Sequence, residues 1–411
     1  MHGRAGGARV EGAERPMRLR IATLNTWAFP EPLAERLDER MEALAQHIPA
    51  LGADILALQE VWVARARARL VAAGAAAGLA HAWSSDGAFL GGGLVLLSRL
   101  PFTAARFEPY SLNGVPHRPT HPDFYGGKGF QLASVATEVG PVSLVNTHLH
   151  ARYGSDVHHQ YEGHRAAQLV QLASALTTVR NPVALAGDFN FDESHDEYRA
   201  FLGLVGARDA GADVGSVEPT VWRGNPYRAG RTSPGHRIDF VFTRDGVAHE
   251  VRATAGRRIF DEVLERDGVR FAVSDHAGVL AEIEIEPRAA RRLPSPTPEA
   301  VALAAGLLTR GNDRAARRRA LHRRRAGVTF GASLVAAAAL RTGPLSRRGF
   351  LRASSQGVTL LALGSTLENS LVAELYGPDE LDGFEGARAT LARLARGEDQ
   401  DRPGDPEHIL G

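Results

Sequence analysis

Apolar positions along the first two thirds of the chain predict alternating strands and helices. Short apolar runs at 19–24 and 54–59 have the length and residue types of buried strands. The segment between them, residues 32–49, repeats apolar residues every three or four positions with charges between them, which predicts an amphipathic helix. Another helix is predicted around 160–180 and a final strand near 277–284. This order of elements indicates a layered α/β domain.

Composition divides the chain into four parts. Residues 1–17 lack an apolar core, which predicts a flexible tail that is neither a signal peptide nor an anchor, and hence a cytoplasmic or peripheral membrane protein. Residues 18–286 form the α/β domain. The Pro, Ser and Thr cluster RRLPSPTPEA marks a linker at 287–300, and residues 301–411 form an appendage that is first basic and then acidic. The chain has no cysteine, which excludes disulfides and thiolate metal sites.

Most of the predicted strands lead directly to a carboxylate, an amide or an imidazole. The motifs in chain order are LNTW, LALQEVW, VNTHLHARY, LAGDFN, RIDFVF and SDHAGV. A divalent metal and a phosphate together need this inventory, because hard oxygen ligands hold the ion, neutral donors hold a phosphoryl oxygen, and a His oriented by a carboxylate can draw a proton from water. The candidate residues are Asn25, Glu60, His148, His150, Asp188, Asn190, Asp239, Asp275 and His276.

Each motif alone has a structural alternative, since an Asn or Asp after a strand often caps a turn and a single His is often a core residue. Their coincidence favours one site, because buried strands that deliver polar groups to one rim are how α/β proteins build sites. Glu60 is the best candidate ligand for Mg²⁺, with Asn25 completing its shell, and Mn²⁺ or Co²⁺ are the expected substitutes. His276 is the candidate general base, because imidazole can accept a proton at neutral pH.

Residues 18–286 resemble the endonuclease/exonuclease/phosphatase superfamily of metal-dependent phosphoesterases. The motifs GDFN and SDH are shared across that superfamily and indicate only the chemistry. Within it the chain is most similar to the neutral sphingomyelinases, through SLNGVPHRPTHPDFYGGKGFQL at 111–132 and NTHLHARYGSDVHHQYEGHRAAQ at 146–168. The resemblance implies a four-layer α/β sandwich, in which helices flank two packed, mostly antiparallel sheets, followed here by a C-terminal helical appendage.

The resemblance also implies roles for individual residues. Asp239 would orient His276, and Asp275 would lie by the metal or the catalytic network. Asp188 would align the attacking water, and Asn190 would donate a hydrogen bond to a phosphoryl oxygen.

Two histidines lie in the motif NTHLHA. The resemblance implies that His148 stabilises the charge of the pentacovalent transition state. His150 lies two residues further on, so the two rings could share one face of an extended segment and bind zinc. The carboxylates and amides among the other candidates favour instead a contact between His150 and the substrate, or support of His148.

Lys128 is the one lysine of the chain, whose other 47 basic residues are arginines. It follows Asp123 by five positions in the glycine-rich stretch HPDFYGGKGF. In the neutral sphingomyelinases, a matching Asp and Lys belong to a loop thought to switch the active site on. The alternative is a flexible turn with a solvated lysine.

Charge separates the α/β domain from the appendage. The first 287 residues contain 29 basic and 34 acidic residues, whereas residues 288–352 contain 15 basic and two acidic residues. A nuclease that grips duplex backbone ordinarily carries a basic footprint, so the acidic domain counts against nucleic acid as a partner.

The appendage combines a basic run with uncharged stretches. Seven arginines lie within residues 314–325, and stretches of 15 uncharged residues follow at 326–340 and 353–367. These stretches are shorter than the ~20 residues that span a bilayer. We expect residues 314–367 to contact an anionic membrane surface. The alternative is a helical appendage that packs on the enzyme and leaves its basic face solvated.

Together these features predict a Mg²⁺-dependent phospholipase C that hydrolyses sphingomyelin or a related phospholipid to phosphocholine and ceramide. The alternatives are another esterase of the superfamily, either an inositol-phosphate phosphatase or a nuclease, and a membrane-binding module with an inactive site. The complete set of motifs argues against an inactive site. The motif SRRGFLR at 346–352 resembles a twin-arginine export signal, but such signals act from the N-terminus, so export is not expected. No oligomeric state is predicted.

Overall fold

Two six-stranded sheets form the centre of the structure, a computed structural model that describes residues 16–85, 91–118, 121, 123–153, 161–230, 235–342 and 349–398. The first sheet contains, in spatial order, β13 (His249–Ile259), β16 (Gly278–Pro287), β1 (Met17–Asn25), β2 (Ile55–Gln59), β4 (Val95–Ser98) and β3 (His81–Ser84). The second contains β5 (Phe102–Pro109), β6 (Gly129–Thr137), β7 (Gly140–His148), β8 (Val183–Asp188), β12 (Asp239–Arg244) and β9 (Arg208–Asp209). Neighbouring strands are antiparallel except for two parallel pairs, β1 with β2 and β7 with β8.

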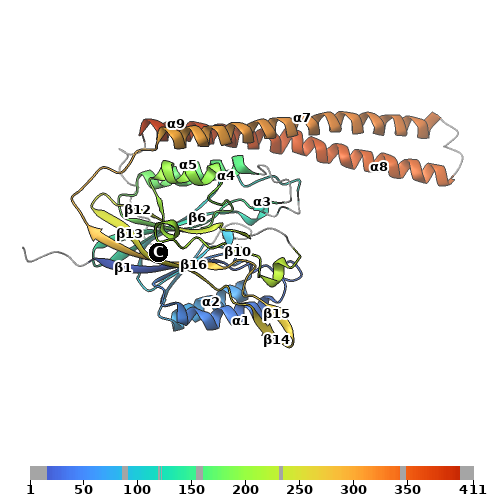
Figure 1. Ribbon diagram of the computed structural model, residues 1–411. Helices are drawn as coiled ribbons and strands as arrows, with labels where there is room; N and C mark the ends of the chain where they lie inside the picture. Colours follow the sequence, from blue (N-terminus) through green and yellow to red (C-terminus); the bar gives the residue numbers. More distant parts are fainter. Residues whose placement is uncertain are drawn as a thin grey trace, which may run out of the picture.

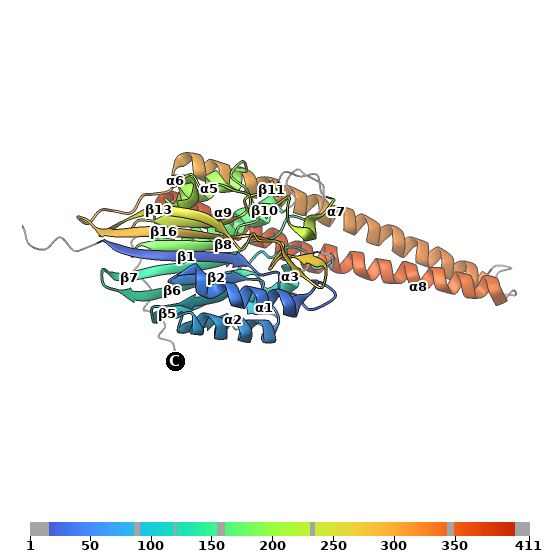
Figure 2. The same cartoon turned by 60° about the horizontal axis from the view of Figure 1, so that its bottom comes forward.

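Helices cover the outer face of each sheet (Figures 1 and 2). The first sheet carries α1 (Leu37–His47) and α2 (Ala64–Ala76), and the second carries α4 (Glu162–Thr177) and α5 (Asp196–Val205). The prediction of a four-layer sandwich is therefore confirmed. The helix predicted over 32–49 begins later, at Leu37, because the preceding residues form turns and Arg36 adopts a left-handed backbone conformation. Shorter elements are α3 (Asp123–Gly126), α6 (Ala210–Asp213), β10 (Val221–Trp222), β11 (Gly235–His236), β14 (Leu264–Arg266) and β15 (Val269–Phe271).

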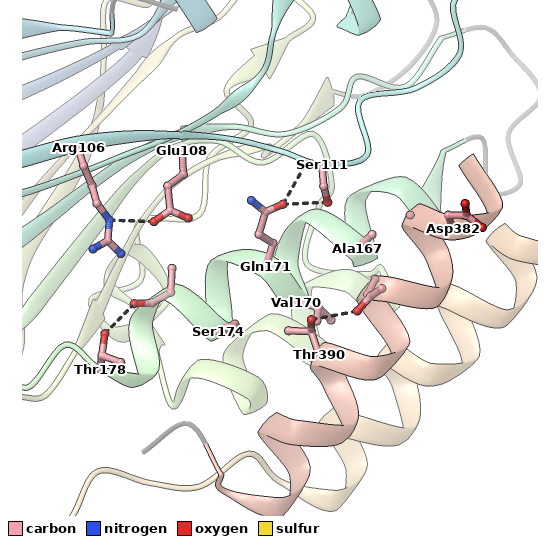
Figure 3. Close-up of a pocket in the computed structure, with 14 residues that line it drawn as sticks. Arg106, Glu108, Ser111, Ala167, Val170, Gln171, Ser174, Thr178, Asp382 and Thr390 are labelled. Atoms are coloured by element: carbon pink, nitrogen blue, oxygen red, sulfur yellow. Dashed lines mark hydrogen bonds and ion pairs between the residues drawn. The ribbon is translucent and has the colours of Figure 1, made fainter. Parts of the chain in front are cut away.

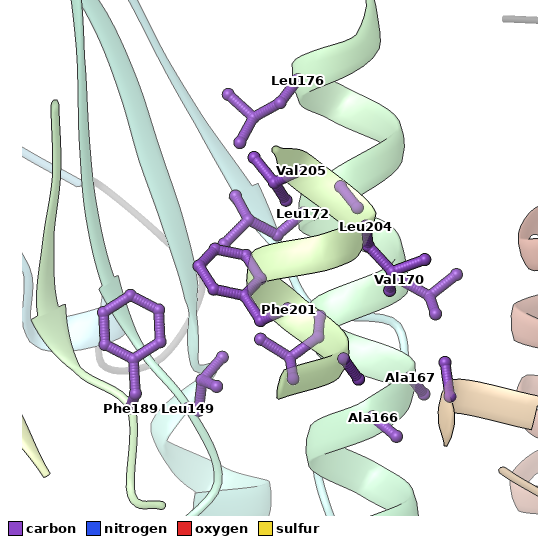
Figure 4. Packing of buried hydrophobic residues seen from close by; sticks show 14 of the residues in the cluster. Leu149, Ala166, Ala167, Val170, Leu172, Leu176, Phe189, Phe201, Leu204 and Val205 are labelled. Atoms are coloured by element: carbon purple, nitrogen blue, oxygen red, sulfur yellow. The ribbon is translucent and has the colours of Figure 1, made fainter. Parts of the chain in front are cut away.

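Apolar side chains fill the spaces between the layers. The inner faces of the two sheets meet through a cluster that includes Ile21, Ile55, Leu144 and Ile283. Central strands are buried on both faces, which is why their sequences are continuous apolar runs without alternation. Outside the second sheet, Figure 4 shows a further cluster between the strands and helices α4 and α5, in which Phe201 of α5 lies beside Leu172 of α4, and Phe189 lies on the side of the strands near Leu149.

The appendage adds a further helical layer on this side. Helix α7 (Pro298–Thr342) begins after residues 288–297, which have no regular secondary structure, and its first turns bury Ala304, Leu307 and Leu308 in the same apolar cluster as α4 and α5. Helix α8 (Gly349–Leu371) returns beside α7, and a π-helical turn (Val372–Tyr376) leads into α9 (Gly377–Arg396), which packs on α4 and α7. The base of the appendage is thus part of the folded domain (Figure 1).

The far part of the α7–α8 hairpin extends beyond the α/β domain (Figures 1 and 2). Polar side chains make contacts between its two helices. The Thr329 and Thr366 hydroxyls hydrogen bond at 2.8 Å, and His322 Nδ1 lies 2.8 Å from Asn369 Oδ1. Its outward side chains are largely apolar and exposed: Val328, Phe330, Leu334, Val335, Val358, Leu360, Leu361, Leu363 and Leu367. No helix of the described residues has both the length and the apolar character to cross a membrane.

Candidate active site

The strand pairings bring the predicted polar residues to one edge of the two packed sheets. Asn25 ends β1 and pairs with Gln59, the last residue of β2, so Glu60 follows at the same edge. In the second sheet, His148 at the end of β7 pairs with Asp188 at the end of β8. Asp239 opens the antiparallel strand β12 opposite Asp188, and His276 lies two residues before β16.

Glu60, His148 and Asp188 form the centre of this site. His148 Nε2 lies 3.7 Å from Glu60 Oε1 and 3.4 Å from Asp188 Oδ2. One candidate ligand atom from each residue falls within 4.8 Å of the others. Among the described residues, a second group of this kind contains Asp188, Asp239 and His276, so Asp188 belongs to both.

The electrostatics of the centre favour a cation. Burial raises the pKa of Glu60 to about 7, and the charge of Asp275 adds to this rise against the opposing effects of Lys128 and Asn25. Burial and the charge of Asp239 likewise raise the pKa of Asp188 to about 6. Glu60 Oε2 is buried without a hydrogen-bond partner in the described structure. A divalent cation would compensate the clustered carboxylates, and hard oxygen donors are the ligands that Mg²⁺ prefers.

His276 and Asp239 form a buried pair, with Nδ1 of the ring 2.9 Å from Oδ2 of the carboxylate. Burial lowers the pKa of His276, but the charge and hydrogen bond of Asp239, with the charges of Asp275 and Asp188, outweigh it and raise the pKa well above its ordinary value. The Ser274 hydroxyl accepts a hydrogen bond from the backbone N–H of His276 and donates one to the Asn25 carbonyl. This serine ties the loop that carries His276 to the end of β1.

Three predicted residues lie beside this centre in orientations that sequence could not indicate. Asn25 donates through Nδ2 to Glu60 and Asp188, at 3.0 and 2.9 Å, while its Oδ1 accepts from a backbone N–H of the next turn. Asn190 donates its side-chain N–H to the Leu149 carbonyl, and its backbone N–H donates to Asp188. Asp275 is half-buried and acts on the centre through its charge. The predicted roles of these residues stay predictions.

Lys128 and Asp123 are paired inside the protein, not solvated. Their Nζ and Oδ1 atoms lie 2.9 Å apart, and the lysine side chain is 1% exposed. Lys128 Nζ also lies 2.8 Å from His148 Nε2 and donates to the Leu149 carbonyl. Burial and the nearby charge of Lys128 lower the pKa of His148 well below its ordinary value, so the ring is neutral in this arrangement.

His150 belongs to a neighbouring cluster and not to the centre around His148. Its ring stacks on Tyr161 with centroids 4.0 Å apart, and its Nδ1 lies 3.4 Å from Asp123 Oδ2. The two rings diverge because β7 ends at His148, so the alternation of an extended strand does not continue to His150. Among the described residues, no group of potential metal ligands contains both histidines.

Sequence reasoning did not identify the buried amides beneath the site. Gln59, directly before Glu60, donates to the Asn146 side chain at 2.8 Å, and this bond links the two sheets. Asn146, two residues before His148, donates in turn to Gln131 at 2.9 Å. The signal that could have identified them is a Gln or Asn inside an otherwise apolar strand run.

Comparisons with known proteins identify relatives of the chain. The chain is 32% identical over 282 residues to a protein of Drosophila melanogaster described as a putative neutral sphingomyelinase, a match that covers 66% of this chain and 62% of that protein. It is 32% identical over 184 residues to the inositol phosphosphingolipids phospholipase C of Schizosaccharomyces pombe, covering 43% of this chain and 42% of that one. The chain thus matches about three fifths of the length of the first relative and less than half of the length of the second.

A solved structure has the same fold. The crystal structure of sphingomyelinase C from Streptomyces griseocarneus superimposes with a TM-score of 0.53 at 23% identity, covering 65% of this chain and 99% of that one. The sequence profile described as the Endonuclease/Exonuclease/phosphatase family matches residues 22–276. This range contains every candidate residue of the site, from Asn25 to His276. The chain therefore belongs to the endonuclease/exonuclease/phosphatase family.

Proposed function

We propose that the protein is a metal-dependent phosphodiesterase of the phospholipase C type, which hydrolyses sphingomyelin or a related phospholipid to phosphocholine and ceramide. The observation that carries the proposal is the position of the His276–Asp239 pair against the cluster of Glu60, His148 and Asp188, because Asp188 belongs to both. The descriptions of the two relatives, a putative neutral sphingomyelinase and an inositol phosphosphingolipids phospholipase C, support phosphosphingolipids as the substrate class.

The residues of the site can perform the steps of this reaction. Water attacks phosphorus, and its proton passes to the ring nitrogen of His276 that does not face Asp239. Asp188 aligns the water, and the amide of Asn190 stabilises negative charge on the phosphoryl oxygens. His148 would add to this stabilisation when its Nε2 carries a proton and no longer accepts from Lys128. The bond between phosphorus and the ceramide oxygen breaks, and that oxygen leaves as the alcohol when it takes a proton from solvent. His276 then releases to solvent the proton that it accepted from the attacking water.

The donor set fits a divalent metal, for which we propose Mg²⁺. Glu60 would hold it, with Asn25 and Asp275 completing the surroundings. The unpartnered Glu60 Oε2 supports this assignment. Asn25 Oδ1 accepts one hydrogen bond, from the backbone N–H of Trp27, and has a second lone pair for the ion. A bound Mg²⁺ supplies electrostatic stabilisation of phosphoryl charge.

The Asp123–Lys128 pair fits an active-site switch. The ammonium group lies against His148, so it stands where it could also contact a phosphate oxygen. We propose that the paired state described here places Lys128 for that contact, and that an unpaired Asp123 would release it.

Substrate assays decide between this proposal and other reactions of the family. The full-length protein is incubated with Mg²⁺ and, separately, sphingomyelin, lysophospholipids, inositol phosphates and DNA, with His276→Ala as the control preparation. We expect release of phosphocholine from sphingomyelin by the unaltered protein only. Faster hydrolysis of an inositol phosphate or of DNA would replace the substrate proposal but keep the chemistry, and hydrolysis of nothing would indicate an inactive site.

We also propose that the α7–α8 hairpin, within residues 314–367, contacts an anionic membrane surface. Its far part buries hydroxyls and amides and exposes Val, Leu and Phe, the reverse of a soluble hairpin. Arg317, Arg324 and Arg325 are exposed on the same helix nearer the domain, where they could pair with lipid phosphates.

Vesicle binding tests the membrane proposal. Replacing residues 326–367 with a short Gly/Ser loop removes the apolar part but keeps the buried base of α7 and α9. This variant should hydrolyse detergent-dispersed substrate normally, yet bind phosphatidylserine vesicles more weakly than the full chain. Equal binding by the two proteins would exclude the hairpin as the membrane contact.

A further inference from the structure

The start of α9 contacts the α/β domain through a buried charged residue. Glu380 Oε1 lies 3.0 Å from His164 Nε2 of helix α4, and the two side chains are 8% and 6% exposed. Arg318 of α7 contacts the same carboxylate. Burial raises the pKa of Glu380, but His164 and Arg318 outweigh it and hold the value at about 2. Glu380 is therefore an anion fixed between the appendage and α4.

His164 is the first of several rings that lead from this contact toward the active site. Its centroid lies 5.1 Å from that of Tyr161 and 5.7 Å from that of His150. Tyr161 and His150 are stacked, and His150 lies against Asp123, the partner of Lys128. A continuous set of buried side chains thus joins Glu380 to the ammonium group beside His148.

Close packing holds this set in place. Gly114 lies so near His150 that a Cβ added there would fall 2.3 Å from Nε2 of the ring. The loop that contains Gly114 is itself in contact with α9, since a Cβ at Gly383 would fall 2.9 Å from Leu112 Cδ1. The appendage therefore limits the position of His150 from two sides.

The close approach of the helices depends on glycine. The α carbons of Gly163 in α4 and Gly311 in α7 are so near that a Cβ on either residue would lie within 2.8 Å of the other residue's Cα. Phe384 of α9 covers this crossing and also contacts the edge of His164. By contrast, a groove of about 590 Å³ separates another face of α9 from α4 and β5 (Figure 3). The tight contact is thus concentrated around Glu380 and Phe384.

We propose that Glu380 is a positioning residue for the active site, which acts through His164 and His150 to hold Asp123 and Lys128 in their paired arrangement. The appendage would then set the turnover rate of the domain on which it packs, whatever its far part binds. The test by enzyme kinetics rests on the proposed function, because it needs a substrate. The test by hydrogen exchange rests on the geometry alone.

Variants of the full-length protein test this role. Glu380→Ala should lower kcat on detergent-dispersed sphingomyelin by about ten- to a hundredfold, the effect typical of losing a residue that orients a ligand or catalytic group, with KM little changed. Glu380→Gln keeps an acceptor for His164 and should recover most of the rate. The matched control is Glu374→Ala, which removes the exposed ion pair between Glu374 and Arg323 of α7 but leaves His164 untouched.

A second measurement needs no substrate. The backbone N–H of Ala151 donates to Asp123 Oδ2 at 2.6 Å, so its hydrogen exchange reports the position of the carboxylate. Exchange at Ala151 should accelerate in Glu380→Ala and stay unchanged in Glu374→Ala. If Glu380→Ala does not fold, His164→Gln interrupts the same set of rings without leaving Arg318 unpaired, and should give the same kinetic and exchange changes.

The outcomes separate the two proposals. If the unaltered protein hydrolyses no phosphosphingolipid, the proposed function fails, and Ala151 exchange still tests the positioning role. Normal kcat and normal Ala151 exchange in Glu380→Ala, or equal losses in Glu380→Ala and Glu374→Ala, would overturn the role of Glu380.

Discussion

Replacing Asp239 with Asn should move the pH dependence of turnover. The general base must be unprotonated, so kcat/KM rises as pH increases through the pKa of His276. Asp239 favours the protonated ring through its charge and its 2.9 Å hydrogen bond, and this raises that pKa above its ordinary value. Removing the charge lowers the pKa, so the acid limb of the profile should move to lower pH.

The size of this movement follows from the contact. Asp239 is fully buried, and a hydrogen bond to a charged group contributes about 1.5–3 kcal/mol. One pKa unit corresponds to about 1.36 kcal/mol, so the limb should move by about one to two pH units. The plateau should fall in Asp239→Asn, and fall further, by about 10²- to 10⁴-fold, in His276→Ala, which removes the proton acceptor itself.

The assay is kcat/KM against pH, between about pH 5 and 9, with saturating Mg²⁺ and under conditions in which chemistry limits the rate. Asp192→Asn is the matched control, because Asp192 makes similar contacts with His195 and His236 and none with His276. An acid limb that stays in place in Asp239→Asn, or one that survives in His276→Ala, would refute the assignment of the base.

Three other changes have defined outcomes. Glu60→Gln should abolish turnover and weaken Mg²⁺ binding in calorimetry while the thermal unfolding of the metal-free protein changes little, and EDTA should mimic it; near-normal rates in either case would contradict a metal-dependent reaction. Lys128→Arg should impair turnover because a planar guanidinium cannot replace a buried ammonium, and Asp123→Ala should impair it because it removes the partner carboxylate. The double variant should be no worse than the more damaged single variant. Additive effects, with Lys128→Arg as active as the unaltered protein, would exclude the switch. Gly311→Ala should lower the free energy of unfolding in urea by about 1–3 kcal/mol through overpacking, whereas Gly331→Ala, in an open part of the same helix, should not lower it; equal effects would show that the helix crossing is not tightly packed.

The sequence was most informative where a polar residue follows an apolar run. Asn25, Glu60, His148 and Asp188 could be grouped because each comes at or just after the end of a strand, and parallel neighbours share an edge. The direction of His150 could not be predicted, because it lies beyond the end of β7, where the twofold alternation of side chains no longer applies.

Packing of the appendage on the domain was one of two alternatives from the sequence, and the pattern did not show which residues would make the contact. In α7, the apolar residues that pack on the domain are mostly small, and the arginines that follow include both exposed ones and Arg318, which contacts a buried carboxylate. One charged segment therefore contains both solvated and structural arginines, which composition alone does not separate. The motif SRRGFLR lies partly outside the described residues, as do most of the predicted N-terminal tail and the end of the appendage.

The amides beneath the site affect the order in which the enzyme assembles. Gln59 and Asn146 are 87 residues apart and belong to different sheets, so their hydrogen bond forms only when the sheets pack on each other. Until then each side-chain amide hydrogen bonds to water, and Glu60 and His148 remain far apart. A long sequence separation makes such a contact slow to close. Catalytic competence should therefore appear late in folding, and a fragment that ends between β4 and β5 should gain activity only after it associates with the rest of the chain.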